Sequence, residues 1–427
     1  MASLFPVLRT NPMSLQGPIL IVADKPAIQL AQALTDAGAF PVIEASWYGA
    51  CTALAEVKPS AVVIAALDHS NADTAQALAR QAAEASPFVP VLARVPDDLP
   101  FPLPDVLTVP EAASFARLVT RLSAALRVRT LHATVLTRSL ALKAEREIVA
   151  ELPDGDPLDD ATVLLIGRGR HHATLSVAVG ECMGVIGALS VDTAARCLVA
   201  REVDGVVIGD GLAAGAVDAF LTLFAEDSRF RELPVALLGH RDDATAPTKL
   251  VCARDPLALL QRAAPLIRLR AFETALKRLL ASIECKGMLD AQTGLLTSTA
   301  FGPALGLAIE DAGERGVGLS LARFSFDDLI DRRTNLDAAR LVSRLLRDSD
   351  FACRQEDGSI LFVFGDTDLR GAHVAARRLA SVLKHTMLRP GGERPTASPS
   401  VTLATLKPGD TVLTLLGRVI PRPVAAA

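Results

Sequence analysis

Two fully apolar runs decide the fold of the first part of the chain, ILIVA at Ile19–Ala23 and AVVIAAL at Ala61–Leu67. Ala- and Leu-rich amphipathic segments follow them, at residues 29–37 and 72–85. A strand that is apolar at every position has both faces buried, which is typical of a parallel sheet with helices on each side. We therefore predict an α/β domain with a parallel sheet over residues 16–150.

The same pattern returns in the second part of the chain. TVLLIG at Thr162–Gly167 matches the first apolar run, and DGVVIGDG at Asp204–Gly211 matches the second. The repeat is far longer than the roughly 20–50 residues of a solenoid unit, so it indicates a duplicated domain. The junction ELPDGDPLDD, residues 151–160, has the Pro, Gly and Asp content of a linker. We predict a second parallel α/β domain over residues 160–284, ending in a long helix.

Residues 287–427 follow a different pattern. Helical and strand segments alternate around one hairpin, FACRQEDGSILFVF at Phe351–Phe364, and the last strand is expected at Ser400–Thr405. A central antiparallel hairpin between helices is the arrangement of ferredoxin-like folds. We predict a third α/β domain of this kind.

Composition excludes several classes of protein. The 427-residue chain has 44 Lys and Arg against 48 Asp and Glu, a formal net charge of −4, and only 4% aromatic residues. This argues against nucleic-acid polymers as partners, since these need basic surfaces or stacking aromatics. The longest apolar stretch, residues 175–191, contains Glu181 and is short for a membrane span. The six cysteines have no metal-type spacing, so we expect reduced thiols in a cytoplasmic protein with no metal site and no membrane insertion.

Two motifs in the third part resemble those of a known family. DAQTGLLTSTAF at Asp290–Phe301 resembles the opening motif of GGDEF (diguanylate cyclase) domains, and RDSDFACRQEDGSI at Arg347–Ile360 resembles the region of their signature. The first two domains resemble response-regulator receivers, and the order receiver–receiver–GGDEF is similar to that of PleD-type cyclases. The resemblance implies two flavodoxin-like (CheY-like) receiver domains followed by a ferredoxin-like GGDEF domain.

The residues that cyclase chemistry needs are replaced. Glu356 and Asp357 stand where the family has two glycines, and Gly358 stands where it has a metal-binding acid. In the first strand, Arg323 or Ser325 falls near the position of the other metal carboxylate. Because phosphoryl transfer depends on Mg²⁺ to neutralise charge, we predict no enzyme activity, no catalytic residue and no cofactor. Residual cyclase activity is the alternative.

The chain keeps the residue types with which the family binds the product of the cyclase reaction. In the family, R-x-x-D just upstream of the signature binds cyclic di-GMP, and here Arg347 and Asp350 match it. A guanidinium can donate two hydrogen bonds to guanine or phosphate, and a carboxylate can accept from the guanine N–H groups. Arg354 and either Arg377 or Arg378 are further candidates for the site. The alternative is that Arg347 and Asp350 form a surface pair and that the other arginines are solvated.

The phosphorylation sites of both receiver-like domains are also altered. The acceptor positions carry Ala65 and Gly209, while Asp68 and Asp210 stand nearby as doubtful phosphoacceptors. Val109 replaces the expected Lys in the first domain. We therefore expect the two domains to act as adaptors that form a homodimer without phosphorylation.

The resemblance to members of this family that have lost the signature implies a role as a cyclic di-GMP receptor or adaptor. Such a protein would act in two-component or phosphorelay signalling that controls the cell cycle, at the cell pole. Its partners would be proteins of a polar-localisation or regulated proteolysis pathway. A dimeric scaffold that binds no ligand is the alternative function.

Overall fold

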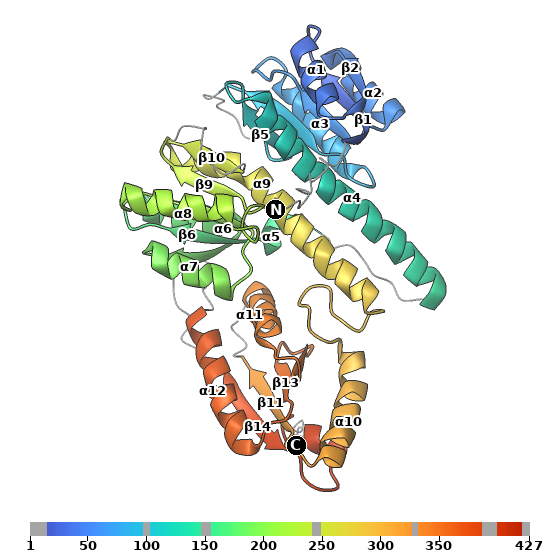
Figure 1. Ribbon diagram of the computed structural model, residues 1–427, viewed down its shortest axis with the longest axis vertical. Coiled ribbons are helices and arrows are strands. Elements are labelled where there is room, and N and C mark those ends of the chain that lie inside the picture. Colours follow the sequence, from blue (N-terminus) through green and yellow to red (C-terminus); the bar gives the residue numbers. More distant parts are fainter. Residues whose placement is uncertain are drawn as a thin grey trace, which may run out of the picture. The chain divides into compact units, whose positions relative to one another are not determined.

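The computed structural model describes residues 15–96, 103–146, 155–240, 249–326, 332–386 and 399–420. The chain divides into two compact units. One unit comprises Met1–Leu136 and Ala213–Arg270, and the other comprises Thr137–Leu212 and Ala271–Ala427. Figure 1 labels the elements, and its colours follow the sequence. The predicted domain boundary at residue 150 and the chain end at residue 427 lie outside the described residues.

The first sheet has five strands in the order β2-β1-β3-β4-β5. Its strands are β1 (Gln16–Val22), β2 (Phe40–Ala45), β3 (Ala61–Ile64), β4 (Val91–Val95) and β5 (Val106–Pro110). The helices of this part are α1 (Ile28–Asp36), the short η1 (Trp47–Gly49), α2 (Ala50–Val57), α3 (Ala72–Glu84) and α4 (Phe115–Arg146). All neighbouring strands are parallel, and the order is that of flavodoxin-like folds.

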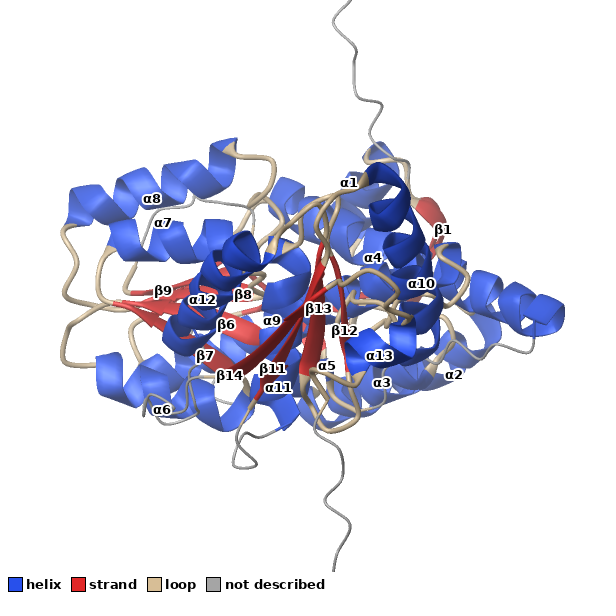
Figure 2. Ribbon diagram, turned by 90° about the horizontal axis from the view of Figure 1, so that it is seen from below, coloured by secondary structure: helices blue, strands red, loops and turns tan. Residues whose placement is uncertain are grey.

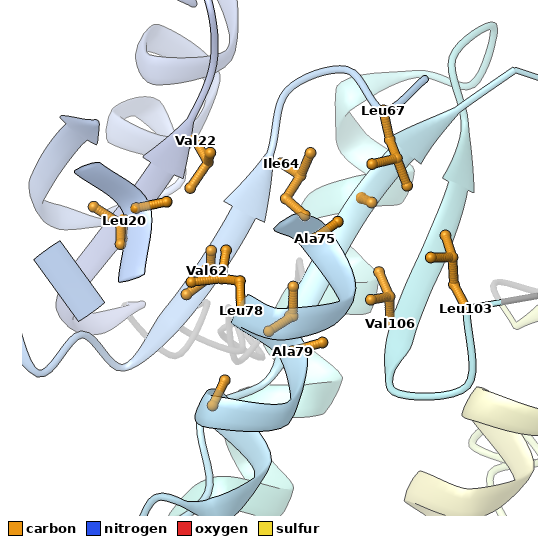
Figure 3. Close-up of a cluster of buried hydrophobic side chains, with 14 of the residues drawn as sticks. Leu20, Val22, Val62, Ile64, Leu67, Ala75, Leu78, Ala79, Leu103 and Val106 are labelled. Atoms are coloured by element: carbon orange, nitrogen blue, oxygen red, sulfur yellow. The ribbon is translucent and has the colours of Figure 1, made fainter. Parts of the chain in front are cut away.

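The strands of the first sheet are buried on both faces, as their uninterrupted apolar sequence predicts. Leu20 and Val22 of β1 pack with Leu78 and Ala79 of α3 in one cluster, which Figure 3 shows. The alternate residue Ile21 is also fully buried. Because successive side chains point to opposite faces of a strand, this alternation places apolar side chains against helices on each side.

The second sheet repeats this topology, in the order β10-β9-β8-β6-β7. Its strands are β6 (Thr162–Ile166), β7 (Gly184–Ala188), β8 (Gly205–Ile208), β9 (Val235–Leu238) and β10 (Leu250–Ala253). The accompanying helices are α5 (Pro157–Asp160), α6 (His172–Cys182), α7 (Val191–Ala200), α8 (Ala214–Glu226) and α9 (Pro256–Glu284). If β6 to β10 are counted as strands 1 to 5, the sheet read from β7 has the order 2-1-3-4-5, which is also the order of the first sheet. The predicted duplication of the fold is therefore confirmed.

The third sheet is antiparallel and has four strands in the order β12-β13-β11-β14. Its strands are β11 (Ser320–Ser325), β12 (Phe351–Arg354), β13 (Ile360–Phe364) and β14 (Ser400–Thr405). The helices are α10 (Ser298–Arg315), α11 (Arg332–Leu345), α12 (Leu369–Thr386) and α13 (Val412–Leu416). Figure 2 shows β13 between β11 and β12. The predicted fold class, two parallel α/β sheets followed by an antiparallel one, is confirmed.

Helices cover both faces of the third sheet. Phe324 and Phe362 belong to the cluster that packs against α11 and α12, whereas Leu321 and Leu361 belong to the cluster that packs against α10 and α13. The sheet is therefore held between two apolar layers, and the turns at its ends carry the polar residues. Among the described residues, no helix is both long enough and apolar enough to span a bilayer.

Candidate functional site: the hairpin and the turn that precedes it

The β12–β13 hairpin closes through a tight turn that runs from Gln355 to Ser359. The Gln355 amide donates to the Ser359 carbonyl at 2.8 Å, and the Gly358 amide donates to the Gln355 carbonyl at 3.0 Å. Gly358 has a φ of 78°, in the left-handed region that glycine adopts without steric cost. The sequence EDGSI thus forms a compact turn in which the glycine sits at the position that requires it.

An internal ion pair ties the hairpin turn to β11. Arg323 donates from Nη2 to Asp357 Oδ2 at 2.6 Å and from Nε to Ser359 Oγ at 3.1 Å. The other carboxylate oxygen of Asp357 accepts hydrogen bonds from the Ser359 amide and hydroxyl. The side chain of Arg323 is only 13% exposed. Of the two first-strand candidates, Arg323 is therefore the one that reaches the hairpin, and it brings a cation there.

The ionisation of Asp357 fits this arrangement. Burial by itself would raise the pKa of Asp357, but the hydrogen bonds from Ser359 and the charge of Arg323 outweigh it and hold that pKa below its ordinary value. The carboxylate is therefore charged and engaged at neutral pH. Among the described residues, no group of three or more His, Cys, Asp or Glu side chains could hold a metal ion.

A second contact fixes the hairpin to α11 through a buried amide that the sequence analysis missed. Asn335 donates from Nδ2 to the Gly358 carbonyl at 2.7 Å, and its Oδ1 accepts from Arg354 Nε at 2.6 Å. Asn335 is 7% exposed, and it lies on α11 next to the buried Leu336. The guanidinium of Arg354 is therefore directed at α11, at the end of β12 away from Asp350.

Arg347 and Asp350 lie in the turn that leads from α11 into β12. The sequence pattern predicts a helix over residues 336–347, but the helix ends at Leu345, so Arg347 lies in the turn that follows it. The Asp350 amide donates to the Arg347 carbonyl at 3.0 Å, and Asp350 Oδ1 accepts from the Gly365 amide at 3.1 Å. The turn therefore has a fixed backbone, anchored on the end of β13.

The two side chains of this turn differ in exposure. Arg347 is exposed, and Asp350 is partly buried. Burial raises the pKa of the Asp350 carboxyl, while hydrogen bonds from the Gly365 and Arg347 amides and the charge of Arg347 act in the opposite direction. The arrangement presents an exposed guanidinium beside a carboxylate that backbone amides hold in place.

The remaining arginine candidates lie on α12. Arg377 and Arg378 are both exposed. In the part of the chain that the structure describes, neither forms an ion pair with Asp350, whose charged neighbour is Arg347. Among the described residues, contacts therefore link Arg347 with Asp350, and no ion pair links Asp350 to the other three candidate arginines.

The two doubtful phosphoacceptors are both engaged in local contacts. Asp68 is exposed, and its Oδ1 accepts from the Ser70 hydroxyl at 2.6 Å and from the Ser70 amide at 2.8 Å. These hydrogen bonds lower the pKa of Asp68. Asp210 Oδ2 lies 3.0 Å from Nδ1 of His171, whose amide also donates to the same carboxylate. Asp68 thus stabilises its own loop, whereas Asp210 links the loop after β8 to the loop after β6.

We expect the conformation of the hairpin turn to make Gly358 sensitive to substitution. A Cβ atom at residue 358 would lie 2.8 Å from Asn335 Nδ2, in addition to the strain of a positive φ. Gly358→Ala should destabilise the hairpin by about 1–2 kcal/mol. A matched control is Gly313→Ala in α10, where a Cβ meets open space and should stabilise the helix by up to about 1 kcal/mol. Native-state hydrogen exchange of the amides in β12 and α10 measures both; equal protection in the Gly358→Ala hairpin would contradict the expectation.

Comparison with known proteins finds similar solved structures but no matching sequence family. No family model matches the chain, and no curated protein matches it. Among solved structures, the coiled coil and GGDEF domain of DgcB from Caulobacter crescentus in complex with c-di-GMP is 20% identical, with 34% of this chain and 82% of that chain covered and a TM-score of 0.30. The FimX GGDEF domain from Pseudomonas aeruginosa is 18% identical, with 31% and 88% covered and a TM-score of 0.28. At this level of identity a likeness carries neither activity nor ligand to this chain.

Proposed function

We propose that the chain is a non-catalytic receptor for cyclic di-GMP, which binds at the Arg347–Asp350 turn. The observation that carries the proposal is the contrast between two adjacent sites. The hairpin is filled by its own ion pair between Arg323 and Asp357, whereas the turn before it presents an available guanidinium beside an anchored carboxylate. The charged side chains of the first site are bonded to each other, whereas the guanidinium of the second is exposed.

The contacts of the hairpin support the absence of cyclase activity. A cyclase needs divalent cations beside the phosphates of its substrate, and these require carboxylate ligands. The guanidinium of Arg323 would repel a cation, and its partner Asp357 already accepts three hydrogen bonds or ion-pair contacts from the protein. The residues here do not fit a Mg²⁺ site, and we derive no catalytic step from them.

The chemistry of the Arg347–Asp350 turn suits a guanine dinucleotide. An arginine can donate two parallel hydrogen bonds to O6 and N7 of guanine or to a phosphate oxygen. Asp350 accepts from the Gly365 amide through Oδ1, and a carboxylate has further lone pairs that can accept from the guanine N1–H and N2–H groups. A ligand with two negative charges also gains from the charge of Arg347.

We expect the chain to select cyclic di-GMP over GTP, because the hairpin holds its own ion pair whereas the Arg347–Asp350 turn presents an exposed guanidinium. Equilibrium dialysis of the full chain with labelled cyclic di-GMP should retain the label, and excess GTP with Mg²⁺ should not displace it. Displacement by GTP would contradict this selectivity.

The wider role is proposed from the sequence resemblance. The arrangement of two altered receiver-like domains before a GGDEF-like domain without its signature resembles PopA, a PleD paralogue that acts as a cyclic di-GMP effector. We propose that this chain likewise acts at the cell pole in signalling that controls the cell cycle, with partners from a regulated proteolysis pathway. A dimeric scaffold that binds no ligand is the second candidate, and the ligand titration distinguishes the two.

We expect the chain to form a homodimer without phosphorylation. Asp68 and Asp210 are bound by Ser70 and His171, and hydrogen bonds from these residues hold both pKa values below the ordinary range, against burial in the case of Asp210. Sedimentation should give a dimer with and without acetyl phosphate, and intact-mass measurement should show no phosphoryl adduct. A dimer that forms only after treatment with acetyl phosphate would restore one of these residues as a phosphoacceptor.

A further inference from the structure

Helix α11 leads directly into the proposed ligand turn and has two different faces. One face is apolar and buried in the third sheet's core, through residues such as Ala338, Ala339 and Val342. The other face carries charged residues at helical spacing, Arg333, Asp337 and Arg340. Charged residues on a helix face are ordinarily solvated, but the charged face of α11 is bonded to residues distant in the sequence.

Arg340 makes the central contacts of this charged face. Its Nε donates to the Gln292 carbonyl at 2.9 Å, and its Nη2 lies 3.3 Å from Asp160 Oδ2. Its Nη1 lies 3.5 Å from Asp337 Oδ1, one helical turn away. The side chain of Arg340 is only 12% exposed. One guanidinium therefore joins three segments: α11, the end of α5 just before β6, and the turn that follows Asp290.

Further contacts, made by Arg333, place α11 against the start of β6. Arg333 donates to the Ala161 carbonyl, the residue between Asp160 and β6. A Cβ atom at Gly184, which pairs with the first residue of β6, would lie 3.0 Å from Arg333 Nη2, so a side chain there would require the guanidinium to shift. These residues all belong to the compact unit formed by Thr137–Leu212 and Ala271–Ala427.

Burial and neighbouring charges act in opposite directions on Asp337, whose side chain is 34% exposed. Burial raises the pKa of Asp337, while the charges of Arg340, Arg333 and Arg201 oppose that shift. Arg201 follows α7, so it comes from the same part of the chain as Asp160 and Gly184. Partly desolvated ion pairs of this kind depend on geometry, and the loss of one partner leaves a charge uncompensated.

We propose that Arg340 is a positioning residue that docks α11 on the start of β6 and thereby sets the placement of the Arg347–Asp350 turn. The helix is continuous to Leu345, two residues before Arg347. A displacement of α11 at Arg340 must therefore move the turn as well. The coupling to ligand rests on the proposed function, but the docking itself does not.

The test uses the full chain and two readouts. Arg340→Gln removes the charge and the fork of donors, and Asp160→Asn removes one acceptor with less disturbance. Arg332→Gln is the matched control, since Arg332 lies on the same helix and is exposed. Hydrogen exchange of the amides in residues 155–161 and 332–340 reports docking. Calorimetry with cyclic di-GMP reports the ligand turn.

In Arg340→Gln, exchange in both peptides should rise about tenfold or more, with a smaller rise in Asp160→Asn and none in Arg332→Gln. Affinity for cyclic di-GMP should change at least about fivefold in Arg340→Gln and remain unchanged in Arg332→Gln. Unchanged exchange in Arg340→Gln overturns the docking, and altered exchange with unchanged affinity overturns the coupling. If the wild-type chain binds no cyclic di-GMP, the proposed function fails while the exchange experiment still decides the docking.

Discussion

Arg347→Ala should weaken the binding of cyclic di-GMP at least about tenfold, which corresponds to about 1.4 kcal/mol. Arg347 is exposed at the turn before β12, and no ion pair with a carboxylate outside the turn holds it in the described residues. Removing its side chain therefore removes donors to the ligand without leaving a buried charge. Calorimetric titration of the full chain measures the difference.

The control for this prediction is Arg315→Ala. Arg315 is the exposed last residue of α10, and it forms ion pairs with Asp311 and Asp366. Its loss removes the same charge from the protein but should leave the affinity unchanged. Equal weakening in both variants would mean that the effect is general electrostatics, and equal affinity of Arg347→Ala and wild type would place the ligand elsewhere.

The second expected result is that the chain makes no cyclic di-GMP from GTP and Mg²⁺, even at enzyme concentrations of micromolar order. The reason is the pair of Arg323 and Asp357, which holds a protein cation at the hairpin. Chromatography of the nucleotides after prolonged incubation checks this. Steady formation of product in proportion to protein concentration would show that the chain is a cyclase.

A graft tests whether the hairpin alone explains the expected lack of cyclase activity. Replacing residues 356–360 with the family signature GGEEF should still give no product, because Arg323 remains next to the turn. The matched variant adds Arg323→Asp to the graft, which supplies a carboxylate where the guanidinium was. Product from the graft alone would show that Arg323 does not prevent cation binding.

Much of the fold could be predicted because its strands are apolar throughout. The runs at Ile19 and Thr162 fall on β1 and β6, and both faces of these strands are buried. The secondary structure of residues 175–191 is harder to predict, because both halves of this stretch are apolar. The structure divides it between α6 and β7, and periodicity cannot separate a buried helix from a short buried strand.

Helix α11 begins at Arg332, four residues before the predicted start at Leu336. Its first turn reads RRTN, which has no apolar periodicity and so gives no signal for a buried helix. Yet Thr334 and Asn335 are buried, because Asn335 finds partners in Gly358 and Arg354. A buried amide of this kind is satisfied only by residues distant in the sequence, so a single sequence could not reveal it.

The candidate site could be predicted from the sequence only where its contacts lie within one short motif. Arg347 and Asp350 are three residues apart and share one turn, so their proximity follows from the motif itself. The pairing of Arg323 with Asp357 depends on the register between β11 and β13, which the sequence does not state. The pairing of His171 with Asp210 likewise depends on the neighbouring positions of β6 and β8.

The most direct test of the central claim is a calorimetric titration of cyclic di-GMP into the full wild-type chain. We expect saturable binding at about micromolar concentration or below, which corresponds to about −8 kcal/mol or stronger. We also expect that the same protein forms no cyclic di-GMP when it is incubated with GTP. The absence of any binding heat from a folded chain, with ligand raised to about a hundredfold above that range, would contradict the account and leave the ligand-blind scaffold as the function.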